Sequence, residues 1–336
     1  AGSVNTPPNK DIRWEKTTTV NVGVDFALFR HRLSGTIEYY NKYSVDLLAA
    51  INGSPTQGFG YTTLMTNNGK MVNRGVEITL SGEIIRQKDF SWNASLLYAF
   101  NRNKVKHISV QPSLWDSRIS MPTSYPMVGK PLYGIYAYKW AGLNENGDPQ
   151  VYDAENNVTS GPARDYHALV YCGTTVPIHN ASLTNVLRYK GFEFSAMLIL
   201  DAGHKLRSSN IPSINMSNGR ITSTAKGIVD RWTQPGDVTD VPRLLFSNDT
   251  ENFNTHRTEL YRYSDLFVYD ASNIRLSNIS LAYRVPAHWC KKISLSGARL
   301  QFNVENVATF AFDSKANYDL GGKVKPNYVW GLYLNF

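Results

Sequence analysis

Long segments in which apolar and polar residues alternate dominate this chain. Apolar residues occupy every second position from Val20 to Leu28, and small or apolar residues do so again from Leu33 to Tyr39. Side chains of a β-strand point alternately to opposite faces, so a period of two predicts strands with one apolar and one polar face. The short polar link at 30–32 joins these two segments, which predicts a β-hairpin.

The same alternation recurs along the rest of the chain. It occurs in the ranges 76–81, 92–101, 192–201, 279–285, 300–305 and 328–336. We therefore expect an all-β chain of about eleven antiparallel strands. This number includes a pair that we place at 132–143 and 149–155. The apolar positions change parity near Ser277 and Asn278, which predicts a β-bulge.

The links between these strands fall into two sizes. Short links lie at 30–32, 86–89, 190–191 and 286–292, and they alternate with long polar links at 47–70, 104–131, 157–177, 206–265 and 307–323. Short turns at one end and long loops at the other are typical of outer-membrane β-barrels. Strands of about twelve residues also exceed the five or six that are usual in a soluble β-sandwich. We therefore predict part of a large transmembrane β-barrel with long extracellular loops.

The chain ends on a segment of large apolar residues at every second position. These residues are Tyr328, Trp330, Leu332, Leu334 and Phe336. An open set of strands leaves unpaired backbone groups, which are costly in hydrocarbon, so further strands must close the barrel. We expect this row to face lipid on the closing strand, with its aromatic residues at the membrane interface. Tyr333 and Asn335 should then face the lumen.

Composition and residue spacing exclude several other classes. The formal charge is +8, but no basic run exceeds Lys291–Lys292, so we expect no nucleic-acid partner. The seven histidines and two cysteines show no local spacing for metal ligands, and we find no nucleophile pattern for catalysis. Cys172 and Cys290 are expected at opposite ends of the strands, too far apart for a disulfide. We predict neither an enzyme nor a cofactor.

Several stretches resemble a known family of membrane proteins. These stretches are 11–48, 67–105, "YKWAGLNENGDP" at 138–149, "RWTQPGD" at 231–237, "SNIRLSNISLAYRVP" at 272–286 and the ending "YVWGLYLNF". They are similar, in the same order, to the C-terminal barrel of SusC/RagA-type TonB-dependent transporters. The resemblance implies that residues 1–336 all belong to a 22-stranded barrel. The plug domain and the N-terminal strands are expected to lie outside this chain.

The same resemblance implies a location and a set of partners. It places the protein in the outer membrane of a Gram-negative bacterium, in contact with lipid, the rest of its own barrel and its plug. It implies a SusD-like surface lipoprotein as a lid, and the TonB complex as the energy source, acting through the N-terminal part. The terminal Phe336 resembles the signal that the outer-membrane assembly machinery recognises.

The expected function is active import of a nutrient, with an oligosaccharide ranked before an oligopeptide. Two alternatives remain open on the residues alone. A passive outer-membrane porin could use the same strands, and it would lack a plug. A secreted β-sandwich adhesin would instead bury its apolar faces against each other.

Aromatic residues in the long loops are the candidates for substrate binding. Flat apolar rings flanked by hydrogen-bonding groups suit both sugars and peptides, and we select Phe59, Tyr61, Trp115, Tyr125 and Trp232. Each of them could instead pack within its own loop. For Trp232, in "RWTQPGD" on an expected short helix, that structural role is favoured. Polar residues on the expected lumen face should hydrate the wall or hold the plug: Asp25, Glu38, Glu77, Glu193, Gln301, Asn303 and Glu305.

Overall fold

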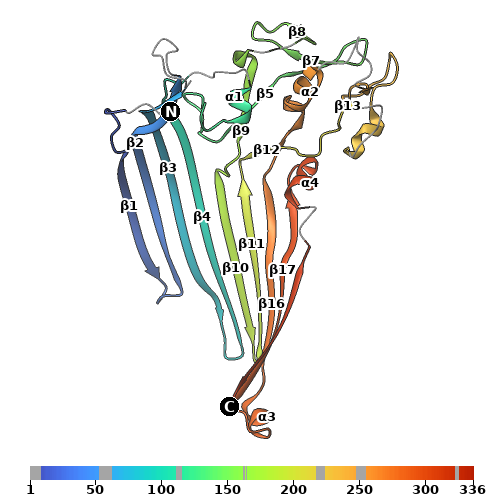
Figure 1. The fold of residues 1–336 in the computed structure, drawn as a ribbon. Coiled ribbons are helices and arrows are strands. Elements are labelled where there is room, and N and C mark those ends of the chain that lie inside the picture. The colour runs from blue at the N-terminus through green and yellow to red at the C-terminus, as the bar shows by residue number, and fades with distance from the viewer. Residues whose placement is uncertain are drawn as a thin grey trace, which may run out of the picture.

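One antiparallel sheet of nine strands forms the body of the computed structural model (Figure 1). The structure describes residues 9–52, 63–110, 116–161, 163, 165–216, 224–246, 255–321 and 325–336. In spatial order the strands are β1 (Lys16–Leu28), β2 (Leu33–Asn52), β3 (Thr63–Arg86), β4 (Phe90–His107), β10 (His179–Tyr189), β11 (Phe192–Ala202), β16 (Asn273–Arg284), β17 (Gly297–Ala311) and β18 (Asn327–Asn335).

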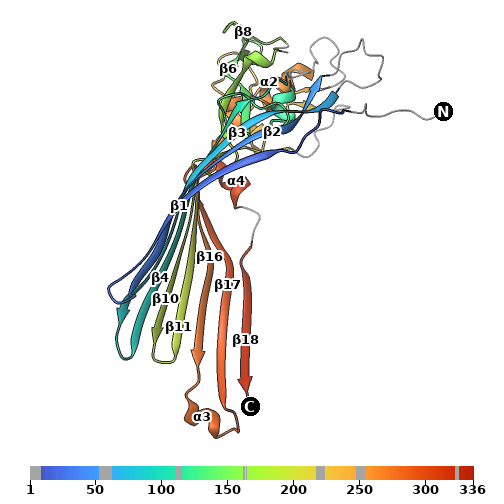
Figure 2. The ribbon, with the colours of Figure 1, turned by 90° about the vertical axis from the view of Figure 1, so that its left-hand side faces the viewer.

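The two ends of this sheet differ, as the link lengths predict. Figures 1 and 2 show the short turns and the C-terminus at one end, here called the turn end, and the long connections at the other, the loop end. Phe29, Arg30 and His31 all have positive φ in the turn between β1 and β2, which lets a very short link reverse the chain. The fourth short link carries helix α3 (Ala287–Lys291).

Among the described residues the main sheet has nine strands, so the expectation of about eleven is corrected. β4 pairs directly with β10, and the segment at 132–152 instead forms β5 (Gly134–Tyr138), β6 (Trp140–Leu143) and β7 (Pro149–Tyr152) in separate small sheets. All five residues of β5 are buried, so neither face of this strand is exposed to lipid. The tyrosines of β5 pack in the core of the cap instead.

The predicted bulge is confirmed. Leu276 and Asn278 of β16 pair with consecutive residues of β11, and Ser277 between them has no partner there. The register with β17 shifts at the same place. Because an extra residue restores the parity, the apolar residues on either side of Ser277 share one face of the sheet.

Apolar side chains line up across the strands near the turn end. One row runs through Trp92, Leu187, Phe194, Leu281, Phe302 and Trp330, and its members are paired strand by strand. The next row runs through Phe90, Tyr189, Phe192, Tyr283, Leu300 and Leu332. The sheet therefore has a continuous apolar face with many aromatic residues at its turn end, as the alternation predicts.

The closing strand β18 has the expected division into two faces. Trp330 pairs with Phe302 and Leu332 with Leu300, whereas Tyr333 pairs with Arg299. Leu334 shares the face of Leu332, and Tyr328 shares that of Trp330, because they are two residues away. That this row meets lipid and pairs with the first strand of a complete barrel stays a prediction.

The long connections fold into a cap of small elements at the loop end. They contain α1 (Ser117–Ser120), β8 (Val158–Thr159), η2 (Tyr166–Ala168), β9 (Leu169–Thr174), β12 (Lys205–Arg207), β13 (Asn215–Met216), η3 (Lys226–Asp230), β14 (Leu245–Phe246), α2 (Thr255–Arg262), η4 (Asp265–Phe267), β15 (Val268–Asp270), η5 (Ser314–Ala316) and α4 (Asn317–Leu320). No described helix is long and apolar enough to cross a membrane.

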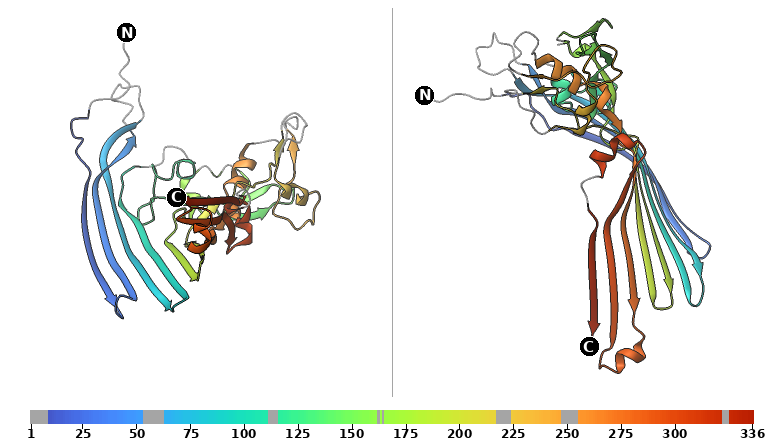
Figure 3. Two further views of the ribbon diagram at one scale, coloured as in Figure 1. Left: turned by 90° about the horizontal axis from the view of Figure 1, so that it is seen from below. Right: turned by 90° about the vertical axis from the view of Figure 1, so that its right-hand side faces the viewer.

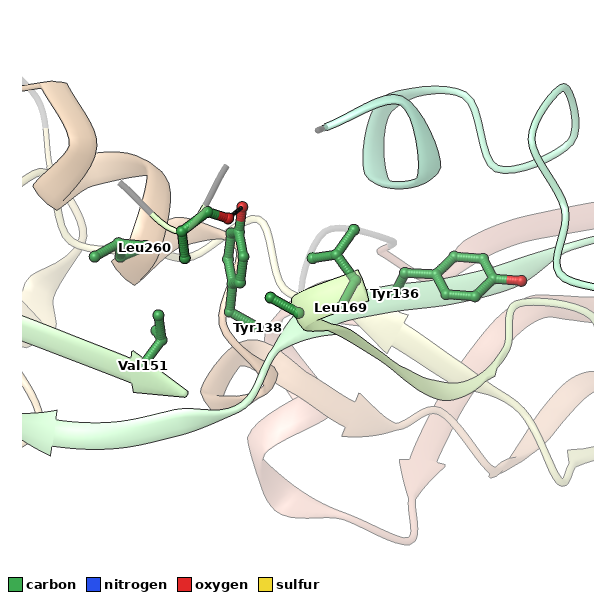
Figure 4. Close-up of a cluster of buried hydrophobic side chains, with 7 residues drawn as sticks. Tyr136, Tyr138, Val151, Leu169 and Leu260 are labelled. Carbon is green, nitrogen blue, oxygen red and sulfur yellow. Dashed lines mark hydrogen bonds between the residues drawn. The ribbon is translucent and has the colours of Figure 1, made fainter. Parts of the chain in front are cut away.

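The principal buried core lies in this cap, away from the main sheet. Tyr138, Val151, Leu169 and Leu260 form one cluster with neighbouring residues, and Figure 4 shows the Tyr138 ring between Leu169 and the pair Val151 and Leu260. The Tyr138 hydroxyl donates a hydrogen bond of 2.8 Å to the carbonyl of Ala163. The cap therefore has a packed interior of its own.

The two cysteines lie at opposite ends, and both are free. Cys172 is in β9 at the loop end, and Cys290 is in α3 at the turn end (Figure 1). This confirms the prediction that they do not form a disulfide.

Candidate functional site

A groove of about 370 Å³ opens at the loop end between the main sheet and the cap. Its walls come from the segment before β1, from β2, β3 and β4, and from the segment that follows β4. They consist of Glu15, Leu47, Leu48, Ala49, Met65, Gly69, Lys70, Met71, Val105, His107, Ile108, Thr123, Ser124, Pro126 and Leu132. Its volume falls at the lower end of the range usual for small-ligand sites.

Extension of β2 and β3 far beyond the expected strand ends builds one wall. The range 47–70 is predicted as loop, yet β2 continues to Asn52 and β3 begins at Thr63. The Leu48 amide donates to Glu15 Oε1 over 2.8 Å, and the Asn67 side-chain amide donates to the Arg13 carbonyl over 2.7 Å. These bonds fix the segment before β1 against the β2–β3 ribbon.

The opposite wall is held to β4 by backbone hydrogen bonds. The Val105 amide donates to the Lys130 carbonyl over 2.9 Å, and the Gly129 amide donates to the Val105 carbonyl over 2.8 Å. The Leu132 amide donates to Asn103 Oδ1 over 2.8 Å. The segment that carries Thr123 and Ser124 therefore has a fixed attachment to the sheet.

The lining of the groove combines apolar walls with a few polar groups. Leu47, Met71 and Val105 provide apolar surface, while His107 and Thr123 provide hydrogen-bonding groups at the same site. Such a lining suits a ligand with flat apolar faces and peripheral polar atoms. In the described part of the chain, no group of three or more His, Cys, Asp or Glu residues could hold a metal ion.

The five predicted substrate-binding residues have different placements. Phe59, Tyr61 and Trp115 lie outside the described residues. Tyr125 follows the groove residue Ser124, but its side chain is only 7% exposed. Its role in substrate binding stays a prediction, and its burial favours the alternative in which it packs within the cap.

Trp232 is half-buried and lies just after η3 in the structured turn "RWTQPGD". Its ring covers Gly147, where an added Cβ would come within 2.4 Å of it. Hydrogen bonds from the Thr233 and Gln234 amides and the Thr233 hydroxyl to Asp237 fix the turn, and they lower the pKa of the Asp237 carboxyl. This environment favours a structural role for Trp232, although substrate contact is untested.

Ion pairs centred on Asp148 join the loops that form the cap. Arg257 in α2 is 1% exposed, and its Nε donates to Asp148 Oδ1 over 2.6 Å. Arg243 also binds Asp148, through Nη2 and Oδ2 at 2.8 Å, and Arg257 donates to Asn215 Oδ1 over 2.6 Å. Asp148 belongs to the sequence "NENGDP", so this motif connects two long loops.

The polar face of the sheet carries the charged residues that the alternation predicts. Glu193 lies between Arg188 and Arg299, at 2.7 and 3.3 Å, while Asp25 accepts a hydrogen bond of 2.6 Å from the Thr36 hydroxyl. Glu38 pairs in register with Glu77, and the structure shows no ion pair for either within its described ranges. That these residues hydrate the wall or hold the plug stays a prediction.

Comparison with known proteins identifies the family. Residues 1–307 match the family model described as "TonB dependent receptor-like, beta-barrel". The chain belongs to this TonB-dependent receptor family. Its members are outer-membrane transporters and not enzymes, so the main sheet is part of an outer-membrane barrel wall and the loop end is extracellular. The family and the single main sheet exclude the β-sandwich adhesin.

Two curated relatives show how much of a complete receptor this chain represents. It is 25% identical over 346 residues to TonB-dependent receptor P3 of Formosa agariphila, covering 96% of this chain and 33% of the relative. It is 25% identical over 312 residues to TonB-dependent receptor SusC of Bacteroides thetaiotaomicron, covering 89% and 29%. The chain spans about a third of the length of these relatives.

A solved structure supports the same fold. The structure of the RagAB peptide transporter matches with a TM-score of 0.77 and 22% identity, over 99% of this chain and 37% of that chain. The resemblance to the C-terminal part of a SusC/RagA-type barrel is therefore confirmed.

Sequence reasoning missed most of the groove. Most of its residues in β2 and β3 fall in a range predicted as loop. The prediction selected aromatic residues in loops, and the groove lining contains no Phe, Trp or Tyr. The available signal was the apolar residues Leu47, Leu48 and Met65, which are unusual in an exposed loop.

Proposed function

We propose that this chain forms the C-terminal barrel wall and the extracellular loops of an active, TonB-dependent nutrient importer. The TonB complex acts on the N-terminal part of the whole protein, and a SusD-like surface lipoprotein covers the loop end. The match of residues 1–307 to the family carries this proposal, and the likeness of the fold to the RagAB structure supports it.

For the cargo, we propose an oligosaccharide first and an oligopeptide second. The extracellular groove supports both, because its apolar walls stand beside His107, Thr123 and Ser124. Sugar rings and peptide side chains both place flat apolar faces next to hydrogen-bonding groups. The genes beside the one that encodes this protein offer a first indication: polysaccharide-degrading enzymes favour a glycan and peptidases favour a peptide.

The proposal is tested by uptake into cells that express the full-length receptor with its lipoprotein. Labelled oligosaccharides and oligopeptides are supplied separately, with and without a functional TonB complex. We expect uptake of one class and its loss without TonB. Uptake that persists without TonB would support a passive porin instead, and uptake of neither class would contradict the proposed cargo.

A histidine substitution tests the groove itself. His107→Ala removes a polar group from the groove lining and should weaken substrate binding about fivefold, as expected for one hydrogen bond of about 1 kcal/mol. His288→Ala is the matched control, because His288 is exposed in α3 at the turn end. Equal affinities of the two variants would show that the substrate binds elsewhere.

A further inference from the structure

Two arginines lie directly opposite each other on neighbouring strands near the loop end. Arg74 of β3 and Arg102 of β4 are register partners, and both are exposed. Lys104 is two residues beyond Arg102 and therefore lies on the same face of β4. These three residues, here called the basic patch, put three positive charges on a small area of the sheet.

The basic patch lies on the outer face of the barrel wall. Val76 and Phe100 continue its face toward the turn end, and they are register partners within the apolar surface. The alternate residues Asn73 and Asn103 bond to each other over 2.8 Å and carry the cap segment on the other face. Figure 3 shows from below that β1 to β4 form a curved wall. The patch therefore faces the surrounding membrane.

The height of the patch places it at the membrane interface. Phe100 and Val76 are the last apolar pair before it on β4 and β3, and Tyr39 and Tyr43 lie beside it on the same face of β2. Aromatic residues are enriched at the level of the lipid headgroups. Because the loop end is extracellular, this level corresponds to the headgroups of the outer leaflet.

Nothing in the described part of the chain neutralises these charges. None of the ion pairs found among the described residues includes Arg74, Arg102 or Lys104, and the side-chain bond of Arg74 is to Asn41 Oδ1, a neutral group at 3.0 Å. Like charges directly opposite each other destabilise a sheet. An anion from outside the chain would reduce the repulsion between Arg74 and Arg102.

We propose that the basic patch binds the phosphate of a phosphorylated lipid headgroup in the outer leaflet. Arginine forks bind phosphate oxygens in pairs, and a lysine adds a point charge. Clusters of basic residues next to a membrane-spanning segment attract anionic lipids. A lipid fits this position better than free phosphate does, because Phe100 and Val76 directly below the patch can contact its acyl chains.

The experiment uses the full-length receptor purified in mild detergent. Native mass spectrometry measures retained lipid, and thermal unfolding is followed after addition of phosphorylated lipid A, dephosphorylated lipid A or inorganic phosphate. For the wild-type protein we expect retained phosphorylated lipid and a rise in Tm with phosphorylated lipid A alone. An equal rise with dephosphorylated lipid A, or a rise with inorganic phosphate alone, would overturn the proposal.

We expect the triple variant Arg74→Gln, Arg102→Gln, Lys104→Gln to retain at least tenfold less phosphorylated lipid than the wild-type protein. Lys42→Gln is the matched control, since Lys42 pairs in register with Asn73 on the opposite face at the same height. It should retain lipid like the wild type. Equal retention by the triple variant would overturn the proposal. If that variant fails to fold, the comparison of the two lipid A forms on the wild type decides alone.

Discussion

Trp330 and Phe302 face each other across the last strand pair, with ring centroids 4.2 Å apart. This contact continues the apolar row of the preceding strands onto the closing strand. It matters because we expect β18 to be the edge at which strands outside this chain complete the barrel. The first prediction therefore concerns the two faces of this strand.

Leu332→Arg should destabilise the barrel because Leu332 lies on the apolar face. A buried arginine on the lipid face costs about 2–4 kcal/mol near the midplane and less towards the interface. Val329→Arg is the matched control, since Val329 pairs with Asn303 on the polar face of the same strand. The free energies of unfolding of both variants are measured by denaturant titration, with heat-modifiable migration in gels as the signal for the folded barrel. A larger loss for Val329→Arg would mean that the faces are reversed.

A polar contact on the apolar face gives a second prediction. Trp92 Nε1 donates a hydrogen bond of 3.1 Å to Asn185 Oδ1, and both residues lie on the face that we assign to lipid. Trp92→Phe removes the donor and leaves the amide unpaired, at a cost of about 1–3 kcal/mol. Adding Asn185→Leu to Trp92→Phe should recover most of the loss. Purely additive effects in this double-mutant cycle would show that the contact is not coupled.

The ion-pair network of the cap gives a third prediction. Arg257→Ala removes one of the two charged partners that Asp148 has among the described residues, Arg243 being the other, and breaking a buried pair costs about 3–5 kcal/mol. The extracellular loops should become sensitive to protease added to intact cells. Arg262→Ala is the control, because Arg262 lies on the same helix but is exposed. If both variants resist protease equally, the network does not hold the loops.

Thiol reactivity gives a fourth prediction, with a clear pH dependence. Burial raises the pKa of the Cys172 thiol to about 11, and the negative charge of Asp265 adds to this effect. The reactive species is the thiolate, so alkylation at pH 8 should be about 100-fold slower than for an ordinary thiol. The rate should rise towards pH 11. Fast alkylation at pH 8, relative to a cysteine introduced at exposed Ser109, would contradict the described packing of β9.

Much of the main sheet could be predicted from the sequence. In β2 and β4 alternation specifies the strand and its faces, and the parity change at Ser277 identifies the bulge, because a period of two leaves few other arrangements. The prediction of an additional strand pair at 132–143 and 149–155 was wrong for a physical reason. The apolar residues of β5 indicate that its side chains are buried, but they do not show whether lipid or protein covers them.

The candidate site was much harder to predict. Aromatic residues in loops are informative only when it is known which of them are already packed, and Tyr125 and Trp232 are largely enclosed by the cap. The groove depends instead on long-range contacts, such as those from Glu15 to Leu48 and from Lys130 to Val105. Such contacts leave no periodic pattern in the sequence.

We expect these strands to form the wall of an outer-membrane barrel that β18 closes. Heat-modifiable migration in gels tests this closure on the full-length protein from outer-membrane fractions, with and without residues Trp330 to Phe336. The complete protein should give a folded, heat-modifiable band, and the truncation should abolish both this band and surface display. A truncated protein that still folds in the outer membrane and imports its substrate would show that β18 does not close the barrel.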